Sequence, residues 1–310
     1  MPAFLLRLSP GPRSSRRLPR LRDGWGGSCR VLALLLGAAA GLARAAVLPQ
    51  PNRTVVYKTI GDVTLRLHVF EPANLPPGGG AAPAIVFFFG GGWQSGTPEQ
   101  FYPHCAHFAA RGMVAMAAEY RIASKHHTTP RECVMDGKSC LRWLHAHRAE
   151  LHIDPARIAA GGGSAGGHVA MAVATLPGLD EPGEDRTVSC QPAALVHFNP
   201  VIDNGPGGYG YERVKDYYRE ISPLHTLRAG LPPTLLMFGT KDKYVPVATA
   251  EKFQRELRAR GNRCELRLYA DQAHGFFNFN DGRNPFYDQT VKAADAFLVS
   301  VGLLAPPPAP

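Results

Sequence analysis

Short apolar runs alternate with longer amphipathic stretches along most of the chain. The runs are typical of strands buried on both faces of a sheet, and the first two flank a Gly-Asp turn as in a β-hairpin. The expected strands are 54–58, 63–70, 84–89, 113–118, 157–160, 193–198, 234–238 and 265–269. The expected helices are 98–111, 131–151, 168–175, 247–260 and 286–301. This alternation predicts an α/β fold with a mostly parallel sheet covered by helices on both faces.

Two segments lack this pattern. Residues 203–231 carry glycine, tyrosine and charge without clear periodicity, and we expect an insertion over the edge of the sheet there. Residues 305–310 are rich in proline and are expected to form a disordered tail. The 310 residues are enough for one sizeable hydrophobic core, so we expect one domain, over residues 46–304.

The first 45 residues have the features of an export signal. Several arginines precede the apolar run 31–43, which is followed by small residues in Ala43-Arg44-Ala45. This run is shorter than the roughly 20 residues that a helix needs to span a bilayer. We therefore predict a signal peptide over residues 1–45, a secreted or periplasmic protein, and no stable membrane anchor.

The distribution of charge argues against a nucleic-acid partner. The formal net charge is +9 at pH 7, but eight arginines and one acidic residue lie in the first 45 residues. The rest of the chain carries 26 basic and 24 acidic residues. A body so close to neutral has little attraction for a phosphate backbone, and no nucleic acid is expected to bind.

Five cysteines follow the predicted leader, and their spacing does not match a zinc site. An odd number cannot all pair within one chain. A disulfide between Cys190 and Cys264 stays open, although buried free thiols are the simpler expectation for most of them. The five are Cys105, Cys133, Cys140, Cys190 and Cys264.

The candidate nucleophile is Ser164. It stands in Gly162-Gly163-Ser164-Ala165-Gly166, between a predicted strand and a predicted helix. A serine in such a sharp turn needs small neighbours, which allow the bend and the close approach of a substrate. The free N–H groups at the start of the following helix favour negative charge that develops beside the serine.

A serine nucleophile needs a base, and the base needs an orienting acid. Asp242 and His274 each follow a predicted strand, and the order Ser, acid, His is the one this fold class uses. Because parallel strands end at one edge of the sheet, we expect all three side chains to meet there. Asp203 and Asp271 are the competing acids, with turn capping as their simpler role.

A glycine run directly after the strand 84–89 is the candidate oxyanion site. Gly90, Gly91 and Gly92 offer backbone N–H groups that no side chain obstructs. The N–H of Ala165, the residue after the nucleophile, would complete the hole.

These motifs resemble those of the α/β-hydrolase esterases of the hormone-sensitive-lipase and acetyl-esterase type. The resemblance runs from about residue 55 to residue 298, and is nearest to exported bacterial acetyl xylan and feruloyl esterases. It implies Ser164 as nucleophile, Asp242 as acid, His274 as base, and Gly91, Gly92 and Ala165 as oxyanion donors. The motifs that carry it are Phe89-Gly90-Gly91-Gly92-Trp93, Glu119-Tyr120-Arg121, 161–167, Gly239-Thr240-Lys241-Asp242 and His274-Gly275-Phe276-Phe277. Phe89 departs from the family, which often has histidine there.

The expected function is hydrolysis of carboxylic esters through an acyl-enzyme, with no metal and no cofactor. Short-chain or carbohydrate-linked acyl esters are the expected substrates, as small molecules or on a polysaccharide. The absence of a long N-terminal cap favours short acyl groups, and the tyrosines of residues 209–218 could stack on sugars or simply pack. The alternatives are a serine peptidase of the prolyl-oligopeptidase kind and a non-catalytic binding protein on a hydrolase scaffold.

Overall fold

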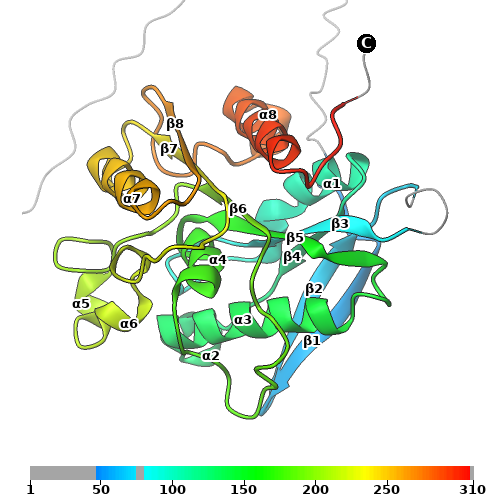
Figure 1. Cartoon of the computed structure of the whole chain (residues 1–310), viewed down its shortest axis with the longest axis horizontal. Coiled ribbons are helices and arrows are strands. Elements are labelled where there is room, and N and C mark those ends of the chain that lie inside the picture. The colour runs from blue at the N-terminus through cyan, green and yellow to red at the C-terminus, as the bar shows by residue number, and fades with distance from the viewer. Residues whose placement is uncertain (1–46, 75–79, 308–310) are drawn as a thin grey trace, which may run out of the picture. The chain divides into compact units, whose positions relative to one another are not determined.

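The computed structural model describes residues 47–74 and 80–307, and within them eight strands form one sheet (Figure 1). The strand order is β1-β2-β4-β3-β5-β6-β7-β8. The first pairs, β1 with β2 and β2 with β4, are antiparallel, and every later pair is parallel. The bounds are β1 Arg53–Ile60, β2 Val63–Phe70, β3 Ala82–Phe88, β4 Val114–Ala118, β5 Ile153–Gly163, β6 Ala194–Phe198, β7 Thr234–Gly239 and β8 Cys264–Tyr269.

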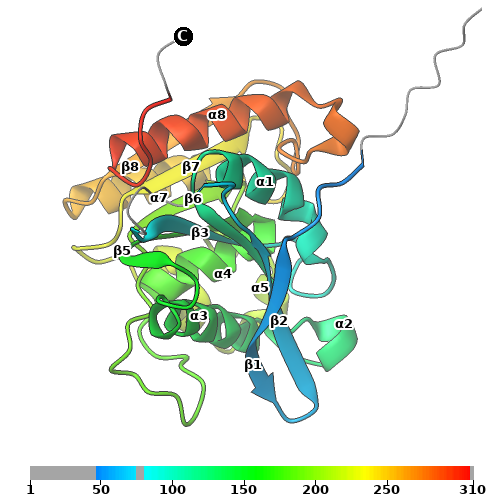
Figure 2. The ribbon, with the colours of Figure 1, turned by 90° about the vertical axis from the view of Figure 1, so that its right-hand side faces the viewer.

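Helices cover both faces of this sheet. The helices α3 and α4 lie on one face, and α1 and α8 lie on the other, as Figure 2 shows. The helix α7 packs against β7 and β8. The bounds are η2 Pro98–Phe101, α1 Tyr102–Ala110, α2 Ala123–His126, α3 Pro130–Ala146, α4 Ser164–Thr175, α5 Tyr211–Val214, α6 Tyr218–Ile221, η3 Pro223–His225, α7 Val247–Ala259, η4 Asn280–Gly282 and α8 Pro285–Ser300. The predicted α/β-hydrolase fold is confirmed.

Local chemistry explains where the longer elements begin. Every residue of β3 is buried, in keeping with its continuous apolar run. The helix α3 starts at Pro130 behind a capping box, in which Thr129 and Glu132 satisfy each other's free backbone N–H groups. At α8, the side chain of Asn284 accepts a hydrogen bond from the N–H of Phe286.

Two predicted boundaries differ from the structure, and the second of them lies at the site. The helix expected over 131–151 ends at Ala146, and the chain turns back through His152, whose φ is +52°. The strand expected over 157–160 is longer and runs from Ile153 to Gly163. The glycines before Ser164 therefore belong to the strand, and Ser164 itself opens the helix α4.

The structure answers some of the other predictions, while others concern residues that it does not describe. All five cysteines are free and buried, so the open disulfide between Cys190 and Cys264 is not formed. In residues 47–74 and 80–307, no helix has the length and apolar character needed to cross a membrane. The predicted signal peptide of residues 1–45 lies outside the described residues, as does the end of the predicted tail, 308–310.

Candidate active site

The structure brings Ser164, His274 and Asp242 into one hydrogen-bonded chain. They follow β5, β8 and β7 respectively, so three parallel strands deliver them to the same edge of the sheet. His274 Nε2 lies 2.8 Å from Ser164 Oγ, and His274 Nδ1 lies 2.7 Å from Asp242 Oδ2. This is the geometry in which a histidine can take the proton of a serine hydroxyl while a carboxylate holds the ring.

The backbone turn at Ser164 is tight and sterically selected. Ser164 has φ +53°, a left-handed conformation that few residues other than glycine adopt without strain. A Cβ on Gly162 would lie 2.5 Å from the carbonyl oxygen of Phe88, and one on Gly166 would lie 2.0 Å from the same atom. Only glycine therefore lets β5 and α4 approach β3 closely enough to form this turn.

The carboxylate of Asp242 is held by neutral donors. Its side chain is fully buried. Oδ1 accepts the backbone N–H of Tyr244 at 2.8 Å and that of Val245 at 3.1 Å, while Oδ2 faces His274. The competing acids lie elsewhere: Asp203 bonds the N–H of Gly205, and Asp271 forms an exposed ion pair with Lys241. Neither makes a hydrogen bond to His274 in the described residues.

The glycine loop after β3 faces Ser164 with free donors. Gly91 has φ +128° and Gly92 has φ +64°, and a Cβ on Gly91 would lie 2.0 Å from the carbonyl oxygen of Ser95. Neither N–H finds a hydrogen-bond acceptor among the described residues. Ala165 occupies the first turn of α4, where N–H groups have no intrahelical partner. The three N–H groups predicted as oxyanion donors are thus of the kind that a developing oxyanion requires.

A cavity of about 300 Å³ opens over the serine. The glycine loop, Ser164 and His274 border it, together with Tyr209 and Tyr244. Tyr244 is 57% exposed, and its ring lies edge-on to His274 with the centroids 4.9 Å apart. Of the four tyrosines singled out in residues 209–218, only Tyr209 borders this cavity, because Tyr217 stacks on Arg131 and Tyr211 packs against Tyr218.

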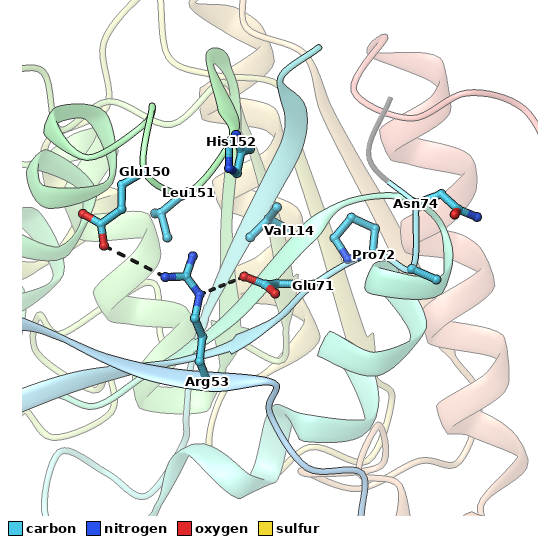
Figure 3. A pocket seen from close by; sticks show the side chains of 9 residues that line it. Arg53, Glu71, Pro72, Asn74, Val114, Glu150, Leu151 and His152 are labelled. Atoms are coloured by element: carbon cyan, nitrogen blue, oxygen red, sulfur yellow. Dashed lines mark hydrogen bonds and ion pairs between the residues drawn. The ribbon is translucent and has the colours of Figure 1, made fainter. Parts of the chain in front are cut away.

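A larger cavity, of about 710 Å³, lies at the opposite edge of the sheet (Figure 3). Val114 and His152, which border it, stand at the amino ends of β4 and β5. Its charged side chains pair with one another: Arg53 contacts Glu71 at 2.8 Å and Glu150 at 4.0 Å. Because no nucleophile stands beside a base among its lining residues, the smaller cavity is the candidate active site.

Sequence reasoning missed a polar chain that joins the glycine loop to the loop that carries His274. The N–H of Gly90 donates to Gln100 Oε1 at 2.6 Å, and Gln100 Nε2 donates to Asn278 Oδ1 at 2.9 Å. Asn278 Nδ2 donates in turn to the carbonyl of Gly275, next to His274. Both side chains border the cavity. In the sequence, Asn278 stands close behind His274-Gly275, and this closeness along the chain was the signal that could have drawn attention to Asn278.

His168, on the helix α4, packs inside the protein and does not face Ser164 or His274. Trp93 Nε1 donates to His168 Nδ1 at 3.2 Å, so His168 Nε2 carries the proton and donates to the carbonyl of Ile221 at 2.7 Å. Burial lowers the pKa of His168 to about 4. This neutral ring joins α4 to the glycine loop and to the 203–231 insertion, in which α5 and α6 lie.

Phe89 also has a supporting role in this loop. Its ring stacks on Tyr120 with the centroids 4.3 Å apart, and Tyr120 donates its hydroxyl to the carbonyl of Phe89 at 2.7 Å. The phenyl ring thus packs beneath the loop, and the backbone N–H groups of Gly91 and Gly92 stay free of hydrogen-bond partners among the described residues.

Comparison with known proteins agrees with this architecture. Residues 85–278, more than half of the chain, match the family model described as alpha/beta hydrolase fold. The chain belongs to this family. Among solved structures, this α/β-hydrolase is similar to esterase 2 of Thermogutta terrifontis in its apo form. The two share 46% identity with a TM-score of 0.80, over 84% of this chain and 98% of that one. The Thermogutta enzyme has also been solved phosphonylated by sarin and with propionate bound.

Two curated relatives are also esterases. The probable carboxylic ester hydrolase LipM of Mycobacterium tuberculosis is 30% identical over 193 residues, which is 54% of this α/β-hydrolase and 42% of LipM. The acetylxylan esterase of Xylanibacter ruminicola is 28% identical over 180 residues, 54% of this chain and 35% of the relative. The chain thus spans less than half the length of these two relatives.

Proposed function

We propose that this α/β-hydrolase is a serine carboxylesterase that acts through an acyl-enzyme on Ser164. The observation that carries the proposal is the chain Ser164–His274–Asp242, with hydrogen bonds of 2.8 and 2.7 Å, at the floor of a cavity bordered by free backbone donors. The esterase names of its relatives and the phosphonylation of the Thermogutta enzyme support the same chemistry.

The reaction follows from the positions of these groups. Ser164 Oγ attacks the ester carbonyl carbon while its proton passes to His274 Nε2. The N–H groups of Gly91, Gly92 and Ala165 stabilise the negative charge on the carbonyl oxygen. His274 then gives its proton to the departing alcohol, and water repeats the sequence to release the acid and restore Ser164. Asp242 keeps the imidazole in the tautomer that leaves Nε2 free.

A short acyl group and a carbohydrate alcohol fit the cavity best. A volume of about 300 Å³ leaves little room to bury a long alkyl chain, so added methylenes gain far less than the ~0.8 kcal/mol of full burial. Tyr244 stands beside His274, which must reach the departing alcohol, and its exposed ring offers a surface on which a sugar can stack. The propionate bound to the Thermogutta esterase and the acetylxylan relative agree with this substrate class.

Ser164→Ala tests the mechanism, and a substrate series tests the specificity. The variant should lower kcat by roughly 10³-fold or more. Mass spectrometry after a fluorophosphonate should find the adduct on the peptide that contains Ser164. Full activity of Ser164→Ala, or cleavage of peptides in place of esters, would refute the proposal; no reaction with the probe at all would indicate a binding protein.

For the substrate, kcat/KM is measured with acetyl, butyryl, octanoyl and palmitoyl esters of one alcohol, followed by acetate release from acetylated xylan. We expect values that fall with chain length and release from the polymer. A steady rise toward palmitoyl would contradict the short-acyl proposal. We also propose that the protein acts outside the cytoplasm after residues 1–45 are removed, so that N-terminal sequencing of secreted protein should begin at or near Ala46.

A further inference from the structure

Asn199 is a buried, strained residue that points at the reacting nitrogen of His274. It follows β6 directly and has φ +39°, in the left-handed region that asparagine tolerates better than most residues. Its side chain is fully buried yet borders the cavity over Ser164. From this backbone the side chain reaches His274, and strain of this kind is typical of functional sites.

The orientation of the amide follows from its partners. The N–H of Gly275 lies 3.2 Å from Asn199 Oδ1, and a backbone N–H can only donate. The atom that faces it is therefore the oxygen. The other end, Asn199 Nδ2, lies 3.2 Å from His274 Nε2, so an amide donor points at the atom that exchanges protons with Ser164.

The ring of His274 has no need of this second donor for its own orientation. Asp242 accepts from Nδ1 at 2.7 Å, so Nε2 carries a lone pair that faces Ser164 Oγ and Asn199 Nδ2 together. Any oxygen that exchanges a proton with Nε2 must come within about 3 Å of it. An N–H group 3.2 Å from Nε2, on the wall of the cavity, is within reach of the same oxygen.

We propose that Asn199 is a further catalytic residue, which donates a hydrogen bond to the oxygen that exchanges its proton with His274. The inference rests on the proposed esterase function. As the bond between the acyl carbon and the alcohol oxygen breaks, its electron pair moves to that oxygen, which receives the proton from His274. The Asn199 amide stabilises the negative charge that builds up there. Water then occupies the same position, gives a proton to His274 and attacks the acyl carbon.

The test is the dependence of the rate on the leaving group. Asn199→Gly removes the amide without backbone strain, and kcat/KM is measured for the ethyl, trifluoroethyl, phenyl and 4-nitrophenyl esters of acetic acid. For ethyl acetate, with its strongly basic leaving group, we expect a loss of about 10- to 100-fold. For 4-nitrophenyl acetate, whose alcohol leaves without help, we expect a loss below about 3-fold. A merely structural role would slow all four esters by one factor.

Two further variants sharpen the test. Asn199→Ala also lacks the amide donor but keeps a Cβ, and at φ +39° it should add one factor from backbone strain, common to all four esters, to the same unequal losses. Asn278→Ser, on the polar chain across the cavity, should slow all esters equally. Equal losses in both Asn199 variants would overturn the proposal. Failure of the esterase function is seen separately, because the wild-type protein would then hydrolyse none of the four esters.

Discussion

Two fully buried aspartates, Asp242 and Asp136, lie in contrasting surroundings. Both side chains have no exposed surface. Asp136, on α3, is neutralised by cations: Lys58 Nζ lies 2.6 Å from its Oδ1, and the Arg121 guanidinium contacts both of its oxygens. Asp242 has only backbone N–H donors and an imidazole. In the proposed mechanism, the positive charge that would balance Asp242 forms when His274 takes the proton of Ser164.

Burial of a carboxylate therefore does not by itself mark a reactive site. A carboxylate with permanent cationic partners is fixed in its charge state and serves the fold, whereas one with neutral partners can respond to a proton on its neighbour. The two aspartates should accordingly differ in what their removal damages. Substitution of Asp242 should lower the rate of turnover, and substitution of Asp136 should lower the free energy of unfolding.

The largest expected effect belongs to Asp242→Asn. The new amide can donate to His274 Nδ1, which moves the imidazole proton to Nε2 and removes the acceptor for Ser164. We expect kcat to fall about 10⁴-fold. The melting temperature should change little, because the asparagine oxygen still accepts the N–H groups of Tyr244 and Val245. A large loss of stability with turnover retained per folded molecule would contradict this distinction.

The sequence predicts a residue of the candidate site only where that residue follows a recognisable strand or motif. Ser164, Asp242 and His274 could be placed because each follows an apolar strand, and parallel strands end at one edge of the sheet. Asn199 follows such a strand as well, but an asparagine before proline looks like any turn, and its contact with His274 joins residues 75 positions apart. Tyr244 carries no signal either, since an exposed tyrosine beside a turn is ordinary.

The pairing of Lys58 and Arg121 with Asp136 could not be predicted from the sequence, for a different reason. Alternation along β1 would place Lys58 on the same side as the exposed Val56. The structure has a bulge between Val56 and Lys58, which inserts Tyr57 as an extra residue and turns both Tyr57 and Lys58 inward. A bulge depends on the partner strand, so nothing within β1 reveals it.

Asp136→Asn should give the largest loss of stability. The substitution leaves Lys58 and Arg121 buried without their shared carboxylate, and breaking a buried ion pair from one side costs about 3–5 kcal/mol. Urea denaturation measures the change. Glu220→Gln is the matched control, because it breaks the exposed pair with Arg131 and should cost no more than about 1 kcal/mol. Equal effects of the two variants would show that burial adds nothing to this cluster.

Glu181, in the same cluster, is expected to make a smaller contribution to stability that depends on pH. Burial alone would raise the pKa of Glu181, but the hydrogen bond from Lys58 and the charges of Lys58 and Arg121 outweigh it and hold the pKa below its ordinary value of 4.5. Its contribution to stability is therefore complete above pH 4.5 and is lost as the pH falls through the lower, folded-state pKa.

Glu181→Gln should thus be less stable than the wild type at neutral pH, and the difference should shrink at acid pH. The measurement is the free energy of unfolding of both proteins in urea, at neutral pH and at successive values below 4.5. Glu220→Gln again serves as the control, with a small difference at every pH. A difference for Glu181→Gln that stays constant on acidification would mean that its carboxylate does not interact with the two cations as the distances of 2.6 Å indicate.

The smallest expected effect concerns Arg213, a cation that contacts the glycine loop but forms no ion pair with a carboxylate among the described residues. Arg213, on α5, donates from Nη1 to the carbonyl of Gly92 at 3.0 Å, and its guanidinium lies 5.4 Å from the ring centroids of Trp93 and Tyr209. It forms no ion pair within the residues that the structure describes. Arg213 therefore differs from Lys58 and Arg121, because it holds the carbonyl of Gly92, next to the N–H groups that are proposed to bind the oxyanion.

Arg213→Met should lower kcat by about 2- to 10-fold, the value of one hydrogen bond, and leave the melting temperature nearly unchanged. Arg219→Met is a matched control, since Arg219 lies on the same insertion with its guanidinium 5.2 Å from the ring of Tyr218 and makes no hydrogen bond to the glycine loop among the described residues. We expect it to keep the wild-type kcat. If the two variants lose the same activity, the effect comes from the insertion as a whole. A loss confined to Arg213→Met means that a cation near Ser164 affects turnover by holding the carbonyl of Gly92. The cations around Asp136, by contrast, affect the free energy of unfolding.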